Sequence, residues 1–165
     1  MLVERIARLQ DMVARGESLP AIYQRVIDDA VALVDADVGS LRLIDAEDPS
    51  WMVAVATRSC VGPDERWRQR APISEGISGR VISTGELVAV EDHRRQPAGS
   101  RLVPADVYAV VAAPLFERDR VVGSLHAAST EVGRRWTPAE RTGLSEYARH
   151  VSGALVVARA ADVLH

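Results

Sequence analysis

The stretch that decides the fold is YAVVAAPLFERDRVVGSLHAA, residues 108–128. It contains two apolar runs, residues 108–116 and 121–128, on either side of the charged turn 117–120. Two runs of strand-forming residues joined by a short polar turn are typical of a β-hairpin. The sequence therefore predicts two antiparallel strands as the centre of the fold.

Further strands are expected before this hairpin. Residues 38–44 alternate apolar and polar side chains, and residues 51–56 follow after a turn with Asp48-Pro49 at its centre. Residues 87–91 form a short apolar run that suits a third strand. Because hairpins predominate, we expect a mainly antiparallel sheet of five to six strands.

Four helices are predicted around this sheet. Residues 2–13 carry an apolar stripe with helical spacing that stops at Gly16, and Ser18 is a suitable N-cap for a second helix that reaches about residue 37. A short helix at 78–84 is closed by Gly85. Thr137-Pro138-Ala139-Glu140 has the residues of a capping box, which predicts a last helix over 137–163.

This element order predicts an α+β fold, an α/β sandwich in a single domain over residues 1–165. The terminal helices would cover one face of the central sheet. The short helix and the fifteen-residue loop 92–106 would roof a pocket on the other face. Within the domain, residues 1–16 form a dimerisation or linker helix and residues 18–157 form the body.

Composition narrows the classes of function. The net charge of −3 gives no reason to expect binding to nucleic acid or to a membrane. Arg66, Arg68 and Arg70 alternate around Trp67, and a solvated strand edge explains them better than a nucleic-acid patch, because acidic residues adjoin them. All 20 basic residues are arginine and asparagine is absent, which fits a bacterial, GC-rich genome.

Cysteine and histidine usage argues against several chemistries. Cys60 is the only cysteine, which excludes an internal disulfide, a redox pair and a cysteine-based zinc site. A lone cysteine and the lack of a signal peptide or apolar span favour the cytoplasm. The four histidines have no metal-ligand spacing, and the sequence lacks the common catalytic motifs, so we expect neither a metal site nor an enzyme.

Several short motifs together resemble a known family. EGISGRV at 75–81 and TGELVAVED at 84–92 are similar to the central signature of GAF domains. APL at 113–115, VVGSL at 121–125 and RWTPAE at 135–140 resemble their final hairpin and the start of their last helix. The resemblance covers residues 19–157. It implies a sensory module of bacterial signalling proteins, such as histidine kinases and transcription regulators, whose terminal helices often mediate dimerisation.

The resemblance also bears on cofactors, and none is expected. Haem is disfavoured because one haem-binding group supplies a histidine where this sequence has Pro104, and cyclic nucleotides are disfavoured because their Asn-Lys signature is impossible here. The related free methionine sulfoxide reductases use several cysteines. Bilin attachment needs a cysteine in a set place, and no motif supports Cys60 in that role.

The candidate pocket follows from strand alternation. Ser40 and Arg42 share one face of their strand, and Ser124 and His126 share one face of theirs. A mostly apolar wall with a few polar groups is typical of a ligand pocket. The alternatives are a solvated face or a hydrogen-bonded core histidine. The roof candidates are Ile77, Val81, His93, Arg101 and Tyr108.

The start of the short helix suggests the charge of the ligand. Backbone N–H groups near Gly76 and Ser78, together with Arg42, favour an anionic small molecule. In the alternative interpretation, Gly76 and Gly79 only permit a turn and close packing.

We expect a ligand-sensing module that dimerises through its terminal helices and acts on an output domain outside this chain. The candidate dimer-interface residues are Leu2, Ile6, Leu9, Val13, Val151, Leu155 and Ala158. One alternative is a pure interaction module whose pocket is filled by its own side chains, although alanines such as Ala112 and Ala127 leave room for a cavity. The other is a small enzyme on the same fold.

Overall fold

The computed structural model describes residues 1–58, 70–95 and 106–164. Its helices are α1 (Leu2–Ala14), α2 (Leu19–Leu33), α3 (Gly76–Thr84) and α4 (Pro138–Val163), with a 3₁₀ turn η2 (His93–Arg95). Its strands are β1 (Val38–Ile44), β2 (Trp51–Arg58), β3 (Ala71–Pro72), β4 (Val88–Val90), β5 (Ala109–Glu117) and β6 (Arg120–Ser129). The predicted α+β class is confirmed.

Within the described ranges, six strands form one sheet in the order β3-β2-β1-β6-β5-β4. Every neighbouring pair is antiparallel, and the predicted β5–β6 hairpin lies next to the central strand β1. The two-residue strand β3 was not expected, because Ala71-Pro72 is too short to show a strand pattern. Segment 58–70, predicted to be irregular, lies mostly outside the described residues.

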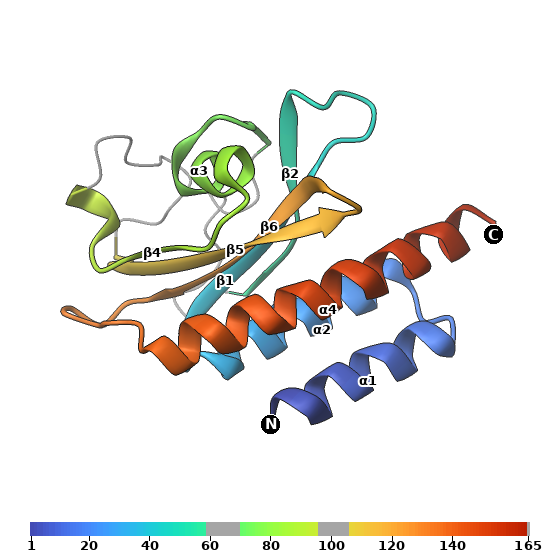
Figure 1. Ribbon diagram of the computed structural model, residues 1–165, viewed down its shortest axis with the longest axis horizontal. Coiled ribbons are helices and arrows are strands. Elements are labelled where there is room, and N and C mark those ends of the chain that lie inside the picture. The colour runs from blue at the N-terminus through green and yellow to red at the C-terminus, as the bar shows by residue number, and fades with distance from the viewer. Residues whose placement is uncertain (59–69, 96–105, 165) are drawn as a thin grey trace.

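The sheet is covered on both faces (Figure 1). Helices α2 and α4 pack on one face, with α1 outside them against both helices, and α3 packs on the other face, as Figure 1 shows. Leu41 and Leu125 point toward the three long helices and belong to the main core. Val110 and Ala112 point the other way and form a second apolar cluster with α3.

The helix ends follow from local chemistry. Ser18 accepts a hydrogen bond from the backbone N–H of Ala21, and Thr137 forms the predicted capping box with Glu140. Helix α2 ends at Leu33 rather than near residue 37, since Asp35 takes a left-handed conformation (φ +52°) that turns the chain toward β1. Helix α3 begins at Gly76, two residues earlier than expected.

The apolar stripe predicted as a dimer interface packs inside the protomer. Leu9 of α1 and Val151 of α4 are fully buried, and Leu155 and Ala158 are nearly so. These residues belong to the core beneath the helices, and α1 packs directly on α4. The remaining members of the stripe are partly buried against the same core, namely Leu2, Ile6 and Val13.

A buried ion pair holds the helix layer together. The Arg5 guanidinium of α1 donates to the Asp29 carboxylate of α2 at 2.5 Å, and Asp29 is 2% exposed. Burial chiefly, and the charge of Asp29 next, raise the pKa of the phenol of Tyr147 in α4. One carboxylate on α2 therefore interacts with a group on each of the other two long helices. None of the described helices is long and apolar enough to cross a lipid bilayer.

We expect Arg5→Met to lower the free energy of unfolding by about 3 kcal/mol or more, because it leaves a buried carboxylate without its cation. The double variant Arg5→Met/Asp29→Leu should recover much of that loss, since it removes both charges. Urea unfolding of the three proteins measures both effects. Equal stabilities for wild type and Arg5→Met would show that the pair does not hold α1 in place.

Candidate functional site: the polar cluster beneath helix α3

Two central strands bring four polar side chains together on the α3 face of the sheet. In the β1–β6 register, Ser40 lies opposite His126 and Arg42 lies opposite Ser124. Because side chains alternate across a strand, these four residues share one face. All four are buried, and none is more than 3% exposed. The faces predicted from alternation are therefore those observed.

Helix α3 supplies the residue that connects this cluster. Ser78, in the first turn of α3, accepts a hydrogen bond from Nη1 of Arg42 at 3.0 Å, and its Oγ lies 2.8 Å from Nε2 of His126. The Oγ of Ser124 lies 2.8 Å from the same nitrogen. The chain approaches closely here, since a Cβ on Gly79 would lie 2.4 Å from the backbone of Ser74. Glycine at position 79 thus lets α3 pack tightly against the segment that leads into it.

Electrostatics set the protonation states within the cluster. Burial lowers the pKa of Arg42 to about 10, against the opposing effect of Glu75, so the guanidinium stays charged at neutral pH. Burial first, and the Arg42 charge second, lower the pKa of His126 well below its usual range. The site therefore holds one buried cation beside a neutral imidazole.

The hydrogen bonds of this cluster join three elements of the fold. Arg42 can only donate, so the Ser78 oxygen accepts from its guanidinium. The hydroxyl groups of Ser78 and Ser124 both lie within hydrogen-bond distance of Nε2 of His126. These contacts link β1, α3 and β6.

The predicted roof residues have mixed outcomes. Ile77 and Val81 lie on α3 and pack into the apolar cluster beneath it. His93 is buried in η2, and its backbone N–H donates to the Tyr108 carbonyl at 2.8 Å. The Tyr108 ring is covered by the guanidinium of Arg94 at 4.2 Å. Arg101, as well as Cys60, Pro104 and the Arg66–Arg68 patch, lies outside the described residues.

Ser78 is the member of this cluster that the sequence does not reveal. The sequence pattern indicates Ser78 only as a source of a backbone N–H, whereas its hydroxyl joins Arg42 and His126. A small hydroxyl residue two positions into a glycine-flanked helix was the available signal. That signal is weak, because it names no partner in the sheet.

Other features of the described residues lie away from this cluster. No group of three or more His, Cys, Asp and Glu side chains there could hold a metal ion. Three cavities found in the same ranges all lie beside α4, on the opposite side of the sheet or at its edge. The polar cluster itself is closely packed between β1, β6 and α3.

The family model for the GAF domain matches residues 16–156. The chain belongs to the GAF domain family. GAF domains are regulatory modules that are found in sensor kinases and phosphotransferases. The search of curated proteins found no match to this GAF domain.

Solved structures share the fold. The GAF domain of a phosphoenolpyruvate-protein phosphotransferase from Coxiella burnetii is 20% identical, with a TM-score of 0.81 over 98% of this chain and 96% of that one. The corresponding domain from Acinetobacter is 19% identical, with a TM-score of 0.78 over 96% and 94%. The free methionine-R-sulfoxide reductase of Neisseria meningitidis, solved with its substrate, is 18% identical, with a TM-score of 0.79 over 98% and 92%.

The depressed pKa of His126 predicts a pH-dependent stability. In the unfolded chain His126 has a pKa of about 6.5. Below that pH the unfolded chain binds a proton that the native imidazole does not bind, so the free energy of unfolding decreases as the pH falls. We expect His126→Gln to remove a slope of about 1 kcal/mol per pH unit below about pH 6. His93, whose pKa burial also lowers, remains in both proteins and cancels in the comparison.

The measurement is urea unfolding of wild type and variant between pH 7.5 and 5.5, with the exposed His150→Gln as control. The control should keep the slope of the wild type. A His126→Gln protein with the wild-type slope would mean that His126 takes up a proton in the native state.

Proposed function

We propose that this GAF domain is a non-catalytic regulatory module that holds a small anionic ligand on the α3 face of its sheet. The observation that carries the proposal is the buried charge of Arg42, which is 3% exposed and bonded to the first turn of α3. A buried cation is costly to maintain in a fold. Its position beneath a short helix suits a role in ligand recognition better than a role in stability.

Three features favour an anion. Arg42 is charged at neutral pH, and the neutral His126 leaves this guanidinium as the charge of the cluster. The first turn of the nine-residue helix α3 lies over the guanidinium, and helix N-termini favour negative charge. A carboxylate or phosphate would match the planar donors of arginine.

The same contacts suggest how binding is sensed. A ligand that takes hydrogen bonds from Arg42 or Ser78 would compete with the bond that holds α3 to β1. Leu41, next to Arg42, packs on the long helices, so a shift of β1 reaches the helix layer. Such coupling requires that the ligand bind one arrangement more tightly than the other.

The absence of catalysis is part of the proposal. The N. meningitidis neighbour was solved with its substrate, which supports a small-molecule site on this fold. Cys60 is the only cysteine of this chain, so the chain has no second thiol to resolve an oxidised one. We also propose that the protein is located in the bacterial cytoplasm, because a lone cysteine suits a reducing compartment.

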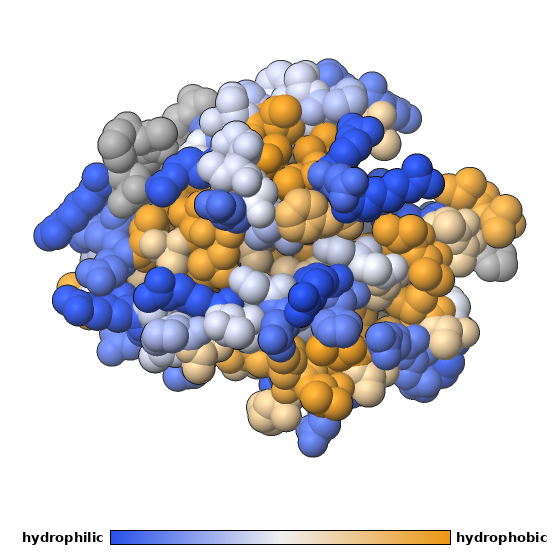
Figure 2. Space-filling view, in the orientation of Figure 1, coloured by the Kyte–Doolittle hydropathy of each residue, from blue (hydrophilic) through white to orange (hydrophobic). Residues whose placement is uncertain are grey.

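A dimerisation module without a ligand is the second candidate, and two observations favour it. Ile77 and Val81 fill the space beneath α3, so its side chains already pack on the sheet. Apolar side chains are also exposed near the end of α4, where Figure 2 shows apolar surface. These residues are Val156, Val157, Val163 and Leu164. A homodimer would use these residues rather than the buried stripe.

Native mass spectrometry of the freshly purified protein, beside its denatured mass, tests the proposal first. A noncovalent adduct that disappears on denaturation is the expected result. The exact mass of the adduct would begin to identify the ligand. Protein without adduct, together with no thermal shift from a panel of small carboxylates and phosphates, would contradict the proposal and favour the second candidate.

We expect Arg42→Gln to weaken binding of the co-purified ligand by about tenfold or more, because a charged hydrogen bond to an anion is lost. Arg8→Gln, an exposed substitution on α1, is the matched control and should leave the adduct unchanged. Adduct occupancy in native spectra and titration of the stripped protein measure the effect. Equal occupancy in both variants would remove Arg42 from the site.

A further inference from the structure

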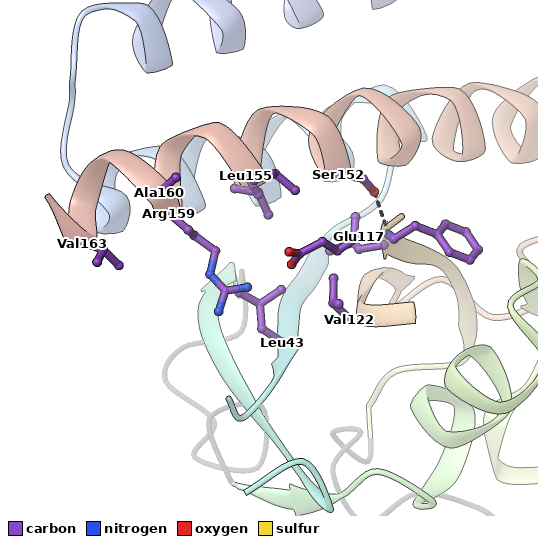
Figure 3. A pocket seen from close by; sticks show the side chains of 11 residues that line it. Leu43, Glu117, Val122, Ser152, Leu155, Arg159, Ala160 and Val163 are labelled. Atoms are coloured by element: carbon purple, nitrogen blue, oxygen red, sulfur yellow. Dashed lines mark hydrogen bonds between the residues drawn. The ribbon is translucent and has the colours of Figure 1, made fainter. Parts of the chain in front are cut away.

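A separate cavity of about 320 Å³ lies on the opposite face of the sheet, beneath the C-terminal turns of α4 (Figure 3). Its volume is at the lower end of the range for small-molecule pockets, about 300–1,000 Å³. The lining residues come from the end of β1, the β5–β6 hairpin and α4. Most of the lining is aliphatic, with Leu43, Val122 and Leu155 among its side chains.

An irregularity in the hairpin lies beside this cavity. Leu115 pairs with Gly123, but Phe116 pairs with Val121, so Val122 is an extra residue in β6. Such β-bulges are frequent beside functional sites. Gly123 also pairs with Leu43 of β1, so a residue without a side chain lies between two leucines that line the cavity.

Helix α4 is anchored over the bulge by Ser152. Its Oγ accepts a hydrogen bond from the backbone N–H of Phe116 at 2.9 Å and donates to the Ala148 carbonyl at 2.8 Å. Figure 3 shows the Phe116 bond at one end of the cavity. The later turns of α4 then extend beyond this anchor and form one wall of the cavity.

Two opposite charges enter the cavity from different elements. In Figure 3 the Glu117 side chain extends from the end of β5, and Arg159 reaches down from α4 toward Leu43. No ion pair within 4.0 Å joins Glu117 and Arg159 among the described residues. The carboxylate and the guanidinium thus flank an apolar floor without neutralising each other directly.

We propose that this cavity is a second ligand site, which binds a free α-amino acid with an apolar side chain. The ammonium group would pair with Glu117, the carboxylate would accept paired hydrogen bonds from Arg159, and the side chain would lie against Leu43 and Leu155. An apolar compartment with two opposite charges matches a zwitterion better than a ligand of a single charge. The site is independent of the Arg42 cluster.

Binding there would act on α4. Arg159, Val156 and Val163 belong to the turns beyond the Ser152 anchor, so a ligand that contacts them would brace this end of the helix against the sheet. A bound amino acid therefore restricts the direction of the C-terminal turns of α4.

The test is an NMR titration of the ¹⁵N-labelled full chain with L-leucine, N-acetyl-L-leucine and L-leucinamide. L-leucine should shift the amide resonances of Val122 and of residues 155–163 in a saturable manner. The two analogues each lack one charge and should bind about tenfold or more weakly. No saturable shift up to about 10 mM L-leucine would overturn the proposal.

Two variants assign the charges. Glu117→Gln should lower the affinity for L-leucine and make it equal to the affinity for N-acetyl-L-leucine. Arg159→Gln should make the affinity for L-leucine equal to the affinity for L-leucinamide. Asp119→Asn, in the same turn but outside the lining, is the control and should bind as the wild type does. Circular dichroism confirms that each variant is folded.

Other results overturn the proposal in distinct ways. Shifts confined to Arg42, Ser78 and His126 would assign leucine to the first site. Shifts of the cavity resonances with protein concentration alone would assign the cavity to a second copy of the chain. Equal affinities for the three compounds would show that neither charge recognises the ligand.

Discussion

The pairing of β1 with β6 at the centre of a sheet that is covered on both faces is the constraint from which the rest of the structure follows. Six of the seven residues of β1 are buried, so neither face can leave a polar group to water. The face toward the long helices satisfies this condition with leucine and alanine. The other face carries Arg42 and His126, and α3 must therefore supply a hydroxyl group at the one place where it can reach both.

Much of the fold could be predicted because its signals are local. The hairpin at 108–128, the cap at Ser18 and the capping box at Thr137 each involve residues a few positions apart. Strand alternation likewise placed Arg42 and His126 on one face. The partner Ser78 lies 36 residues from Arg42, and no periodicity links them. The helix stripe was correctly apolar, but periodicity does not reveal whether its partner is α4 of the same protomer or a second copy.

The two proposed sites share strands although they lie on opposite faces of the sheet. Arg42 belongs to the polar cluster, and its neighbour Leu43 lines the cavity under α4. In β6, Ser124 belongs to the polar cluster and Val122 lines the cavity. Consecutive residues of β1 thus belong to different proposed sites, so a change in the twist of this strand would alter the surroundings of both.

The ion pair between Arg5 and Asp29 affects where the N-terminal boundary of an expressed fragment of this protein should lie. The match to the family model begins at residue 16, yet α1 lies before that point and contributes Arg5 and Leu9 to the interior. An expression fragment designed from the family boundary would expose the groove that Leu9 fills and strand the Asp29 carboxylate. The packed core therefore includes residues that lie before the segment matched by the family model.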